Sequence, residues 1–423
     1  MTTMTPKSPA TWLLSAGHAV DDLYQGAVPA LIPFFVAARH WDYAAASGIT
    51  VAATVLSSVV QPLFGLLTDY RRAPWLVPLG MSVAGAGIGL SGLSHSYWLT
   101  WLAIALSGVG VAAYHPESAR LARLATRGSH VGMSLFSMGG SVGFALGPVI
   151  VGVVLGALGV TGTLPLVVPA LACGLITLLA LRRAPWARRP AAARANGTAE
   201  PASDWPGFAT LTVVVVGRSI VTFGLGTFLA LLTEQRLQAG TAAGEAALIT
   251  FYGAGALGTL LGGRLAGRWG RVRTVRVSYF LAVPALAGIW LLPGPAMFAG
   301  IVASALALYV PFSLHVTLGQ DYLPGRVGTA SGVTLGLAVS LGGVASPLIA
   351  LIADHSTLTT AVAALTAVPA LCALAGLRLH EPAPDQLVGG LPGPGVGGVD
   401  DVHDGDEQAH HAEAGPGLEG AGG

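Results

Sequence analysis

The sequence has little charge and almost no cysteine. Lys, Arg, Asp and Glu make up only 10% of its 423 residues, and hydrophobic residues make up 53%. A soluble domain carries about 25% charged residues, so this composition excludes an ordinary soluble protein and predicts a helical integral membrane protein. The two cysteines, Cys173 and Cys372, both lie in apolar runs. They therefore indicate neither a disulfide framework nor a thiolate metal cluster.

Nucleotide-binding and nucleic-acid-binding motifs are also missing. No Gly-Lys phosphate loop is present, which argues against a nucleotide-driven pump. The stretch "GAGALG" (253–258) matches the dinucleotide fingerprint in its letters. It lies in an apolar span with no preceding strand, so it fails the structural test of that motif. We expect no cofactor, no bound metal, no nucleic acid partner and no enzymatic activity.

Apolar runs dominate what is present. A membrane span needs about 20 mostly apolar residues, and the chain offers twelve such runs between polar or Gly/Pro-rich breaks. The predicted spans are 12–38, 44–68, 74–94, 97–121, 131–158, 161–181, 208–232, 246–266, 274–292, 296–320, 329–352 and 357–377.

The two halves of the chain repeat one another at a spacing of 198–200 residues. "GLLTDYRRA" (65–73) corresponds to "GRLAGRWGRVR" (263–273), and "VPAL" occurs at 168–171 and at 368–371. His115 and Pro148 correspond in the same way to His315 and Pro347. The pattern predicts a duplicated six-helix unit. The predicted domains are a first bundle (1–182), a cytoplasmic linker (183–206), a second bundle (207–380) and a disordered, acidic, Gly-rich tail (381–423).

Basic residues set the expected orientation. With a cytoplasmic N-terminus, 18 of the 21 Lys and Arg residues fall on the same side of the membrane. Because cytoplasmic loops carry the excess of Lys and Arg, both termini are predicted in the cytoplasm. We expect a multi-pass protein of the cell (inner or plasma) membrane that acts as a monomer on a small-molecule substrate and protons.

Several segments resemble the major facilitator superfamily. "GLLTDYRR" resembles its loop signature between spans two and three, and "GGSVGFALGPVIVG" (139–152) resembles the fifth-span signature of proton-coupled drug antiporters. "GHAVDDLYQGAVPALIPFF" (17–35), "AYHPESARLA" (113–122) and "GQDYLPGRVGTASG" (319–332) resemble the fosmidomycin-resistance branch. The resemblance implies two pseudo-symmetric six-helix bundles around a central cavity, alternating access, and export of a small molecule against proton entry. It also implies that Gly65, Asp69, Arg71 and Arg72 form a cytoplasmic conformational latch, although Gly267 replaces the acidic residue in the second copy.

Ionisable residues inside spans are costly and mark function by default. On the first span, His18, Asp22 and Gln25 share one helical stripe, with Asp21 at its edge. Such a stripe avoids lipid by facing a watery cavity, where a carboxylate can bind and release a proton. Asp21 and Asp22 are therefore predicted proton-coupling residues; the alternative is that one of them pairs with an Arg or caps a broken helix.

Further polar candidates lie on other spans. Glu117, in "YHPES", is a third proton-coupling candidate, with a plain i,i+3 ion pair to Arg120 as its alternative. Arg218 is deep in a span and is expected to act as counter-ion to one of these acids or to bind an anionic substrate group; snorkelling to an interface is the alternative. A role in packing is an equal alternative for His115, and Asp321 is expected at the cytoplasmic mouth, paired with Arg326. The predicted substrate-binding residues are His18, Tyr24, Gln25, Tyr114, His115, Arg218 and His315.

Small residues recur on the fifth span. Gly139, Gly143 and Gly147 are four residues apart and are followed by Pro148. A small-residue seam of this kind lets helices approach closely, so these four residues are predicted to serve packing and hinge motion.

Three functions remain open from the residues. The favoured one is a drug:H⁺ antiporter that exports small molecules such as fosmidomycin-like phosphonates. The second is proton-coupled uptake or exchange of a small organic anion. The third is an intramembrane metalloenzyme that uses His18, Asp21, Asp22, His115 and Glu117 as ligands, which metal analysis of the purified protein would reveal.

Overall fold

Apolar segments of this length fold as helices because hydrocarbon offers no partner to a backbone N–H or C=O outside the segment itself. The computed structural model describes residues 8–41, 43–184 and 202–383, and within these ranges every regular element is helical. The described residues fall in one compact unit. Most of the predicted linker (183–206) and tail (381–423) lies outside the described residues.

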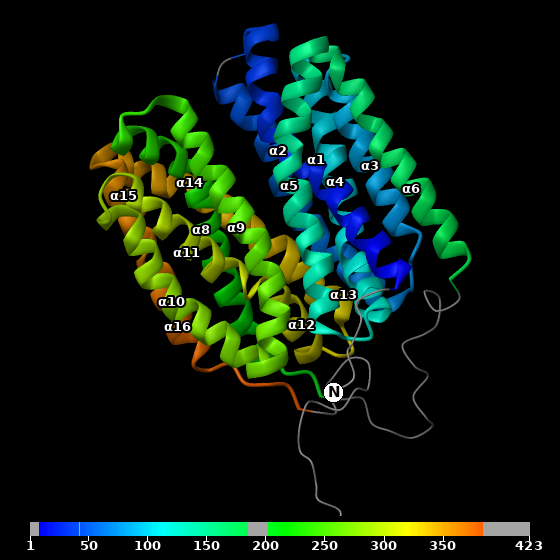
Figure 1. The fold of residues 1–423 in the computed structure, drawn as a ribbon. Helices are drawn as coiled ribbons and strands as arrows, with labels where there is room; N and C mark the ends of the chain where they lie inside the picture. The colour runs from blue at the N-terminus through cyan, green and yellow to red at the C-terminus, as the bar shows by residue number, and fades with distance from the viewer. Residues whose placement is uncertain (1–7, 42, 185–201, 384–423) are drawn as a thin grey trace, which may run out of the picture. The chain divides into compact units, whose positions relative to one another are not determined.

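The first half of the chain makes six helical passes, which Figure 1 shows packed alongside one another. The sixth begins as a 3₁₀ turn, η1, that continues directly into α6. The elements are α1 (Pro9–Arg39), α2 (Tyr43–Tyr70), α3 (Leu76–Ser91), α4 (Tyr97–Ala125), α5 (His130–Leu158), η1 (Val160–Leu166) and α6 (Val167–Arg182).

The second half makes six more passes, three of them built from more than one element. The single helices are α8 (Trp205–Leu237), α9 (Gly240–Trp269) and α10 (Arg271–Leu291). The composite passes are η2 (Gly294–Ala296) with α11 (Met297–Tyr309) and α12 (Phe312–Tyr322); α13 (Val327–Gly332) with the π-helical η3 (Val333–Leu337) and α14 (Ala338–His355); and α15 (Leu358–Leu365) with α16 (Ala367–Gly376). Each of the twelve predicted spans coincides with one of these passes.

Length and composition agree with a membrane location. Among the described residues, nine helical segments are long and apolar enough to cross a bilayer, and α3 is a shorter apolar helix. Many large side chains on the outside are apolar, for example Leu63, Val153 and Ile249, which are 60%, 69% and 73% exposed. Such surfaces suit contact with lipid tails.

The break between α11 and α12 was not predicted. The apolar run predicts one continuous span over 296–320, but α11 ends at Tyr309 and α12 begins at Phe312. Pro311 occupies the N-cap of α12, where its missing N–H costs no helical hydrogen bond. The break redirects the side chains on either side of it, and it lies next to Arg218, as described below.

The buried side chains cluster by half. One hydrophobic cluster is built mainly from α1–α6 and includes Tyr24, Met81 and Phe136, with Val316 and Leu335 added from the second half. Two further clusters contain only residues of α8–α16. The division into two separate domains stays a prediction.

Helices α1 and α5 approach each other along the predicted glycine seam. A Cβ placed on Gly139, Gly143 or Gly147 would collide with the backbone of Ser15, Ala19 or Leu23, respectively. These three partners are also four residues apart, so one row of glycines on α5 faces one row of carbonyls on α1. Pro148, beside the seam, is exposed. The close approach fixes the position of α1, which carries the first polar cluster.

We expect Gly143→Val to destabilise the fold strongly. A Cβ at Gly143 would lie 2.7 Å from the carbonyl carbon of Ala19, which is backbone and cannot rotate away. Overpacking of this kind costs about 1–3 kcal/mol, and a lower thermal midpoint of the purified protein would report it. Gly152→Val is the matched control on the same helix, because a Cβ there has no neighbour within 4 Å. Equal midpoints for the two variants would contradict the seam.

Candidate functional site

Two histidines and two aspartates meet between α1 and α4. The Nε2 atom of His18 lies 3.3 Å from Oδ2 of Asp22, one helical turn away on α1. From α4, Nε2 of His115 lies 3.1 Å from Oδ1 of Asp22. The Asp22 side chain is 13% exposed and both imidazoles are buried. The structure therefore places one carboxyl group between two imidazole nitrogens.

The backbone fixes which nitrogen of each imidazole faces Asp22. Nδ1 of His18 lies 2.9 Å from the carbonyl oxygen of Phe136, and Nδ1 of His115 lies 2.8 Å from that of Val111. A carbonyl oxygen only accepts, so each Nδ1 carries the hydrogen. In the neutral rings, Nε2 then directs a lone pair at a carboxylate oxygen of Asp22. Each of the two Nε2···O contacts is favourable only when a proton lies between its two atoms.

Asp21 adds a second carboxylate to the cluster. Its Oδ2 atom lies 3.6 Å from Nδ1 of His115, and the side chain is fully buried. Neither of its oxygens has a hydrogen-bond donor within the described part of the chain. Burial of an ion without a donor is costly, so the charge of Asp21 depends on the state of His115.

The same cluster has the donor types of a metal site. One ligand atom each from His18, Asp22 and His115 lies within 4.8 Å of the others. Gly140 on α5 faces the cluster, because a Cβ there would come 2.7 Å from the imidazole of His18. Two imidazoles and a carboxylate could hold a divalent transition metal, so metal content is a direct test between this reading and proton binding.

Glu117 lies in an ion pair. Its carboxylate accepts two hydrogen bonds from Arg120, at 2.9 Å from Nε and 2.5 Å from Nη2, and the side chain is fully buried. This is the i,i+3 alternative that the sequence analysis considered. This bidentate contact uses both carboxylate oxygens. The role of Glu117 in proton coupling stays a prediction, with less geometric support than that of Asp22.

The three remaining polar candidates of the first half lie around this cluster. The Tyr24 hydroxyl donates to the carbonyl of Leu166 at 2.8 Å and accepts from the N–H of Ala170 at 2.9 Å, which uses it for packing against the sixth pass. Gln25 lines a cavity of about 10 Å³ between α1, α2 and α4. The ring of Tyr114 lies 6.2 Å from that of His18. Tyr114 therefore borders the cluster, and Tyr24 and Gln25 lie one turn further along α1.

Arg218 on α8 is a buried cation beside the broken pass. It is 5% exposed, and its guanidinium carbon lies 4.5 Å from the ring centre of Phe312 and 5.7 Å from that of Tyr309. These two rings flank the break between α11 and α12. Within the described ranges no carboxylate lies within ion-pair distance of Arg218. The predicted counter-ion role is therefore not what the geometry shows, because Asp22 and Glu117 face other partners.

His315 lies near Arg218 in the second half. Its ring stacks on Tyr279 at 6.0 Å between centres, and its Nε2 lies 3.4 Å from the Tyr279 hydroxyl. Phe312 also packs against the hydrophobic cluster of the first half. The second half thus presents a cation, aromatic rings and a histidine at the boundary between the halves.

Asp69 joins the two halves at one end of the helices. This end, where α1 begins and α16 ends, is called the arginine-rich end below, because it carries Arg71, Arg72, Arg123 and Arg271. The Asp69 carboxylate accepts from the N–H of Gly328 at 2.6 Å and from the N–H and hydroxyl of Thr329 at 2.9 and 2.6 Å. Gly65 permits this contact, since a Cβ there would lie 2.8 Å from the carbonyl carbon of Gly328.

A second contact at this end was missed by the sequence analysis. Asp321 on α12 accepts from Arg123 on α4 and from Arg271 on α10, at 2.5 Å each. Arg326, its predicted partner, instead places its guanidinium over Trp205, so that prediction was wrong. The sequence held no local signal for it, because Arg123 and Asp321 lie 198 residues apart and meet only where two helices pack.

Comparisons with known proteins find a family model and relatives that match most of this chain. A family model described as Major Facilitator Superfamily matches residues 14–347. The MFS-type transporter YfnC of Bacillus subtilis (strain 168) is 28% identical over 87% of this chain and 92% of its own length. The fosmidomycin resistance protein of Escherichia coli (strain K12) is 27% identical over 82% of this chain and 86% of its own length.

Solved structures show the same fold. The transporter FucP in its outward conformation superposes with a TM-score of 0.70 at 12% identity, over 88% of this chain and 99% of its own. The predicted class, an all-α membrane protein with twelve spans in two six-helix bundles, is confirmed. Both predicted resemblances, to the superfamily and to fosmidomycin-resistance proteins, are confirmed as well.

Proposed function

The chain belongs to the major facilitator superfamily and is a multi-pass membrane transporter, and we propose that it exports small anionic molecules in exchange for protons. The arginine-rich end then faces the cytoplasm, in agreement with the positive-inside rule. The observation that carries the proposal is the position of Asp22 between the two Nε2 atoms of His18 and His115.

The cluster supplies a reason for proton coupling. With no proton, Asp22 and the two neutral imidazoles direct lone pairs at one another, as the backbone contacts of the two Nδ1 atoms require. One proton turns one of the two Nε2···O contacts into a hydrogen bond. A second proton does the same for the other contact, and the two protons together balance the charges of Asp21 and Asp22. Since α1, α4 and α5 all contribute groups, a change of protonation changes how these helices pack.

The substrate side of the proposal rests on Arg218. A buried guanidinium without a carboxylate partner binds phosphonate or carboxylate groups in a bidentate manner. Its place beside the break of the tenth pass supports this, because discontinuous helices commonly form transporter binding sites. A fosmidomycin-like phosphonate is our proposed substrate class, and one similar relative is a fosmidomycin resistance protein.

Alternating access requires the contacts at the arginine-rich end to open. In this structure Asp69 caps α13, Asp321 bridges Arg123 and Arg271, and the hydroxyls of Ser134 and Ser313 lie 2.8 Å apart. All three contacts join the two halves. We propose that the structure is the state closed to the cytoplasm and that substrate enters after these contacts break.

Transport in proteoliposomes tests the proposal. Purified protein is reconstituted with a pH-sensitive dye inside, and fosmidomycin is added with and without an imposed pH gradient. Antiport predicts that fosmidomycin moves against the direction of proton movement and that a proton gradient accelerates it. Fosmidomycin moving in the same direction as protons would establish the uptake alternative instead, and movement that ignores the gradient would overturn coupling. Stoichiometric zinc or iron in the purified protein would favour the metalloenzyme.

A further inference from the structure

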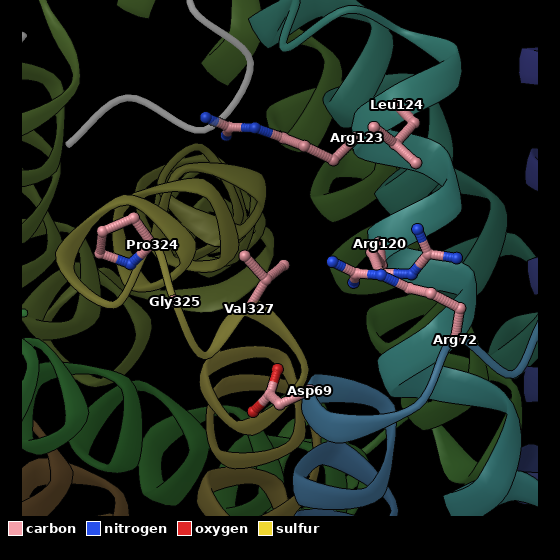
Figure 2. Close-up of a pocket in the computed structure, with 8 residues that line it drawn as sticks. All are labelled: Asp69, Arg72, Arg120, Arg123, Leu124, Pro324, Gly325 and Val327. Carbon is pink, nitrogen blue, oxygen red and sulfur yellow. The ribbon is translucent and has the colours of Figure 1, made fainter. Parts of the chain in front are cut away.

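A pocket at the arginine-rich end lies outside the site just described. Figure 2 shows its lining, which comes from the end of α2 and the following loop, from α4 and from the turn between α12 and α13. It therefore has walls from both halves of the chain. Its volume is about 70 Å³; since one water needs about 10–15 Å³ on this measure, a tetrahedral anion fits. The lining residues are Asp69, Arg72, Arg120, Arg123, Leu124, Pro324, Gly325 and Val327.

The charges on these walls are unequal. Three arginines face one aspartate across the pocket, and that aspartate, Asp69, already accepts three hydrogen bonds from Gly328 and Thr329. Glu117 and Asp321, which form ion pairs with Arg120 and Arg123, are buried outside the lining. The wall of the pocket is thus positive.

Arg72 forms no ion pair with any residue in the described part of the chain, although it lines the same pocket as Arg120 and Arg123. Its guanidinium lies beside that of Arg120 in Figure 2. Burial, together with the neighbouring Arg120 charge, lowers the pKa of Arg72. Among the residues that the structure describes, no carboxylate lies within ion-pair distance of it. Two adjacent guanidinium groups at the wall of a cavity can both donate hydrogen bonds to one anion, whose charge also reduces their mutual repulsion.

We propose that this pocket binds a phosphate group, with Arg72 as its principal ligand and Arg120 and Arg123 as the adjoining charges. A phosphate has enough acceptor oxygens to bind several guanidinium groups at once. Basic pockets between transmembrane helices on the cytoplasmic side also bind phospholipid headgroups. The phosphate comes either from an anionic phospholipid or from a soluble phosphate compound.

A bound phosphate would be held by arginines of the first half and enclosed by a turn of the second half. Arg72 and Arg120 belong to the first half, and Pro324, Gly325 and Val327 belong to the second. The pocket is bounded by Asp69 and Arg123, which make the contacts that hold this end closed. The anion therefore binds the closed state in preference to an open one and stabilises it.

Thermal unfolding of the purified full-length chain tests the site without any transport measurement. In neutral detergent, inorganic phosphate is titrated against chloride at equal ionic strength. In parallel, nanodiscs of phosphatidylglycerol are compared with nanodiscs of phosphatidylcholine. The variants are Arg72→Gln and, as the matched control, Arg71→Gln, whose residue is exposed and does not line the pocket.

We expect phosphate, but not chloride, to raise the thermal midpoint of the wild type and of Arg71→Gln. Arg72→Gln should need about tenfold more phosphate for the same rise, because a bidentate charged contact is lost. Stabilisation only in phosphatidylglycerol, again lost in Arg72→Gln, identifies a lipid headgroup as the source. Equal effects of phosphate and chloride, equal loss in both variants, or no response in either arm would overturn the site. If a variant misfolds, the comparison of phosphate with chloride on the wild-type protein still tests whether the site exists.

Discussion

Asp22→Asn should abolish proton-driven export while the protein still folds and inserts. The change removes one ionisable group and keeps the shape of the side chain. An Asp carboxyl group can release a proton and bind it again, whereas an Asn amide does neither. The cluster of His18, Asp22 and His115 therefore loses one of the groups that exchange protons. We expect the gradient-driven rate to fall by about 100-fold or more, as for loss of a proton-transfer group. Asp21→Asn is expected to act in the same direction.

The measurement is proton release or uptake by proteoliposomes when fosmidomycin is added. Binding of fosmidomycin, followed by isothermal titration, should survive in Asp22→Asn, because that side chain does not hold the anionic group in our proposal. Glu234→Gln provides the control for loss of a carboxylate, since Glu234 lies near the C-terminal end of α8 and not in the cluster on α1 and α4. Wild-type gradient-driven transport by Asp22→Asn would remove this residue from the mechanism.

Arg218→Lys is the second large effect that we expect. The substitution keeps the positive charge but replaces a planar fork by a point charge, so bidentate binding and stacking over Phe312 are both lost. We expect the KM for a phosphonate to rise by about 10-fold or more. The thermal midpoint should change little, because no ion pair of Arg218 is broken within the described residues.

Transport kinetics with fosmidomycin check this expectation. Arg236→Lys is the matched control: Arg236 also lies on α8, and it donates to the carbonyls of Ile289 and Leu292 at 2.6 and 2.9 Å. That variant should lose those contacts without changing KM. An unchanged KM and rate in Arg218→Lys would show that Arg218 is a structural residue.

Local pattern was enough to predict the passes and the residues of the first helix. The twelve apolar runs, the stripe of His18 and Asp22, and the glycine row of α5 all depend on spacing along one helix. The residues of this stripe do not all face the same place, as their spacing had indicated they would. Gln25 lies in a separate small cavity, because α2 packs against α1 at that level.

Contacts between distant segments could not be predicted in the same way. The approach of His115 to Asp22 depends on how α4 packs against α1, and the placing of Arg218 depends on the break at Pro311. Glu117 shows that even a contact within one helix is predicted only in part from the sequence. A neighbouring Arg120 in the same helix was visible in the sequence, but only the geometry shows that both carboxylate oxygens are used.

The double contact of Asp321 has a consequence for the cost of opening this end. Arg123 comes from the first half of the chain, whereas Arg271 comes from the second half, as Asp321 does. When the halves move apart, Asp321 parts from Arg123 but keeps Arg271. Leaving a buried carboxylate without any cation is strongly unfavourable, and the contact to Arg271 avoids that penalty each time this end opens.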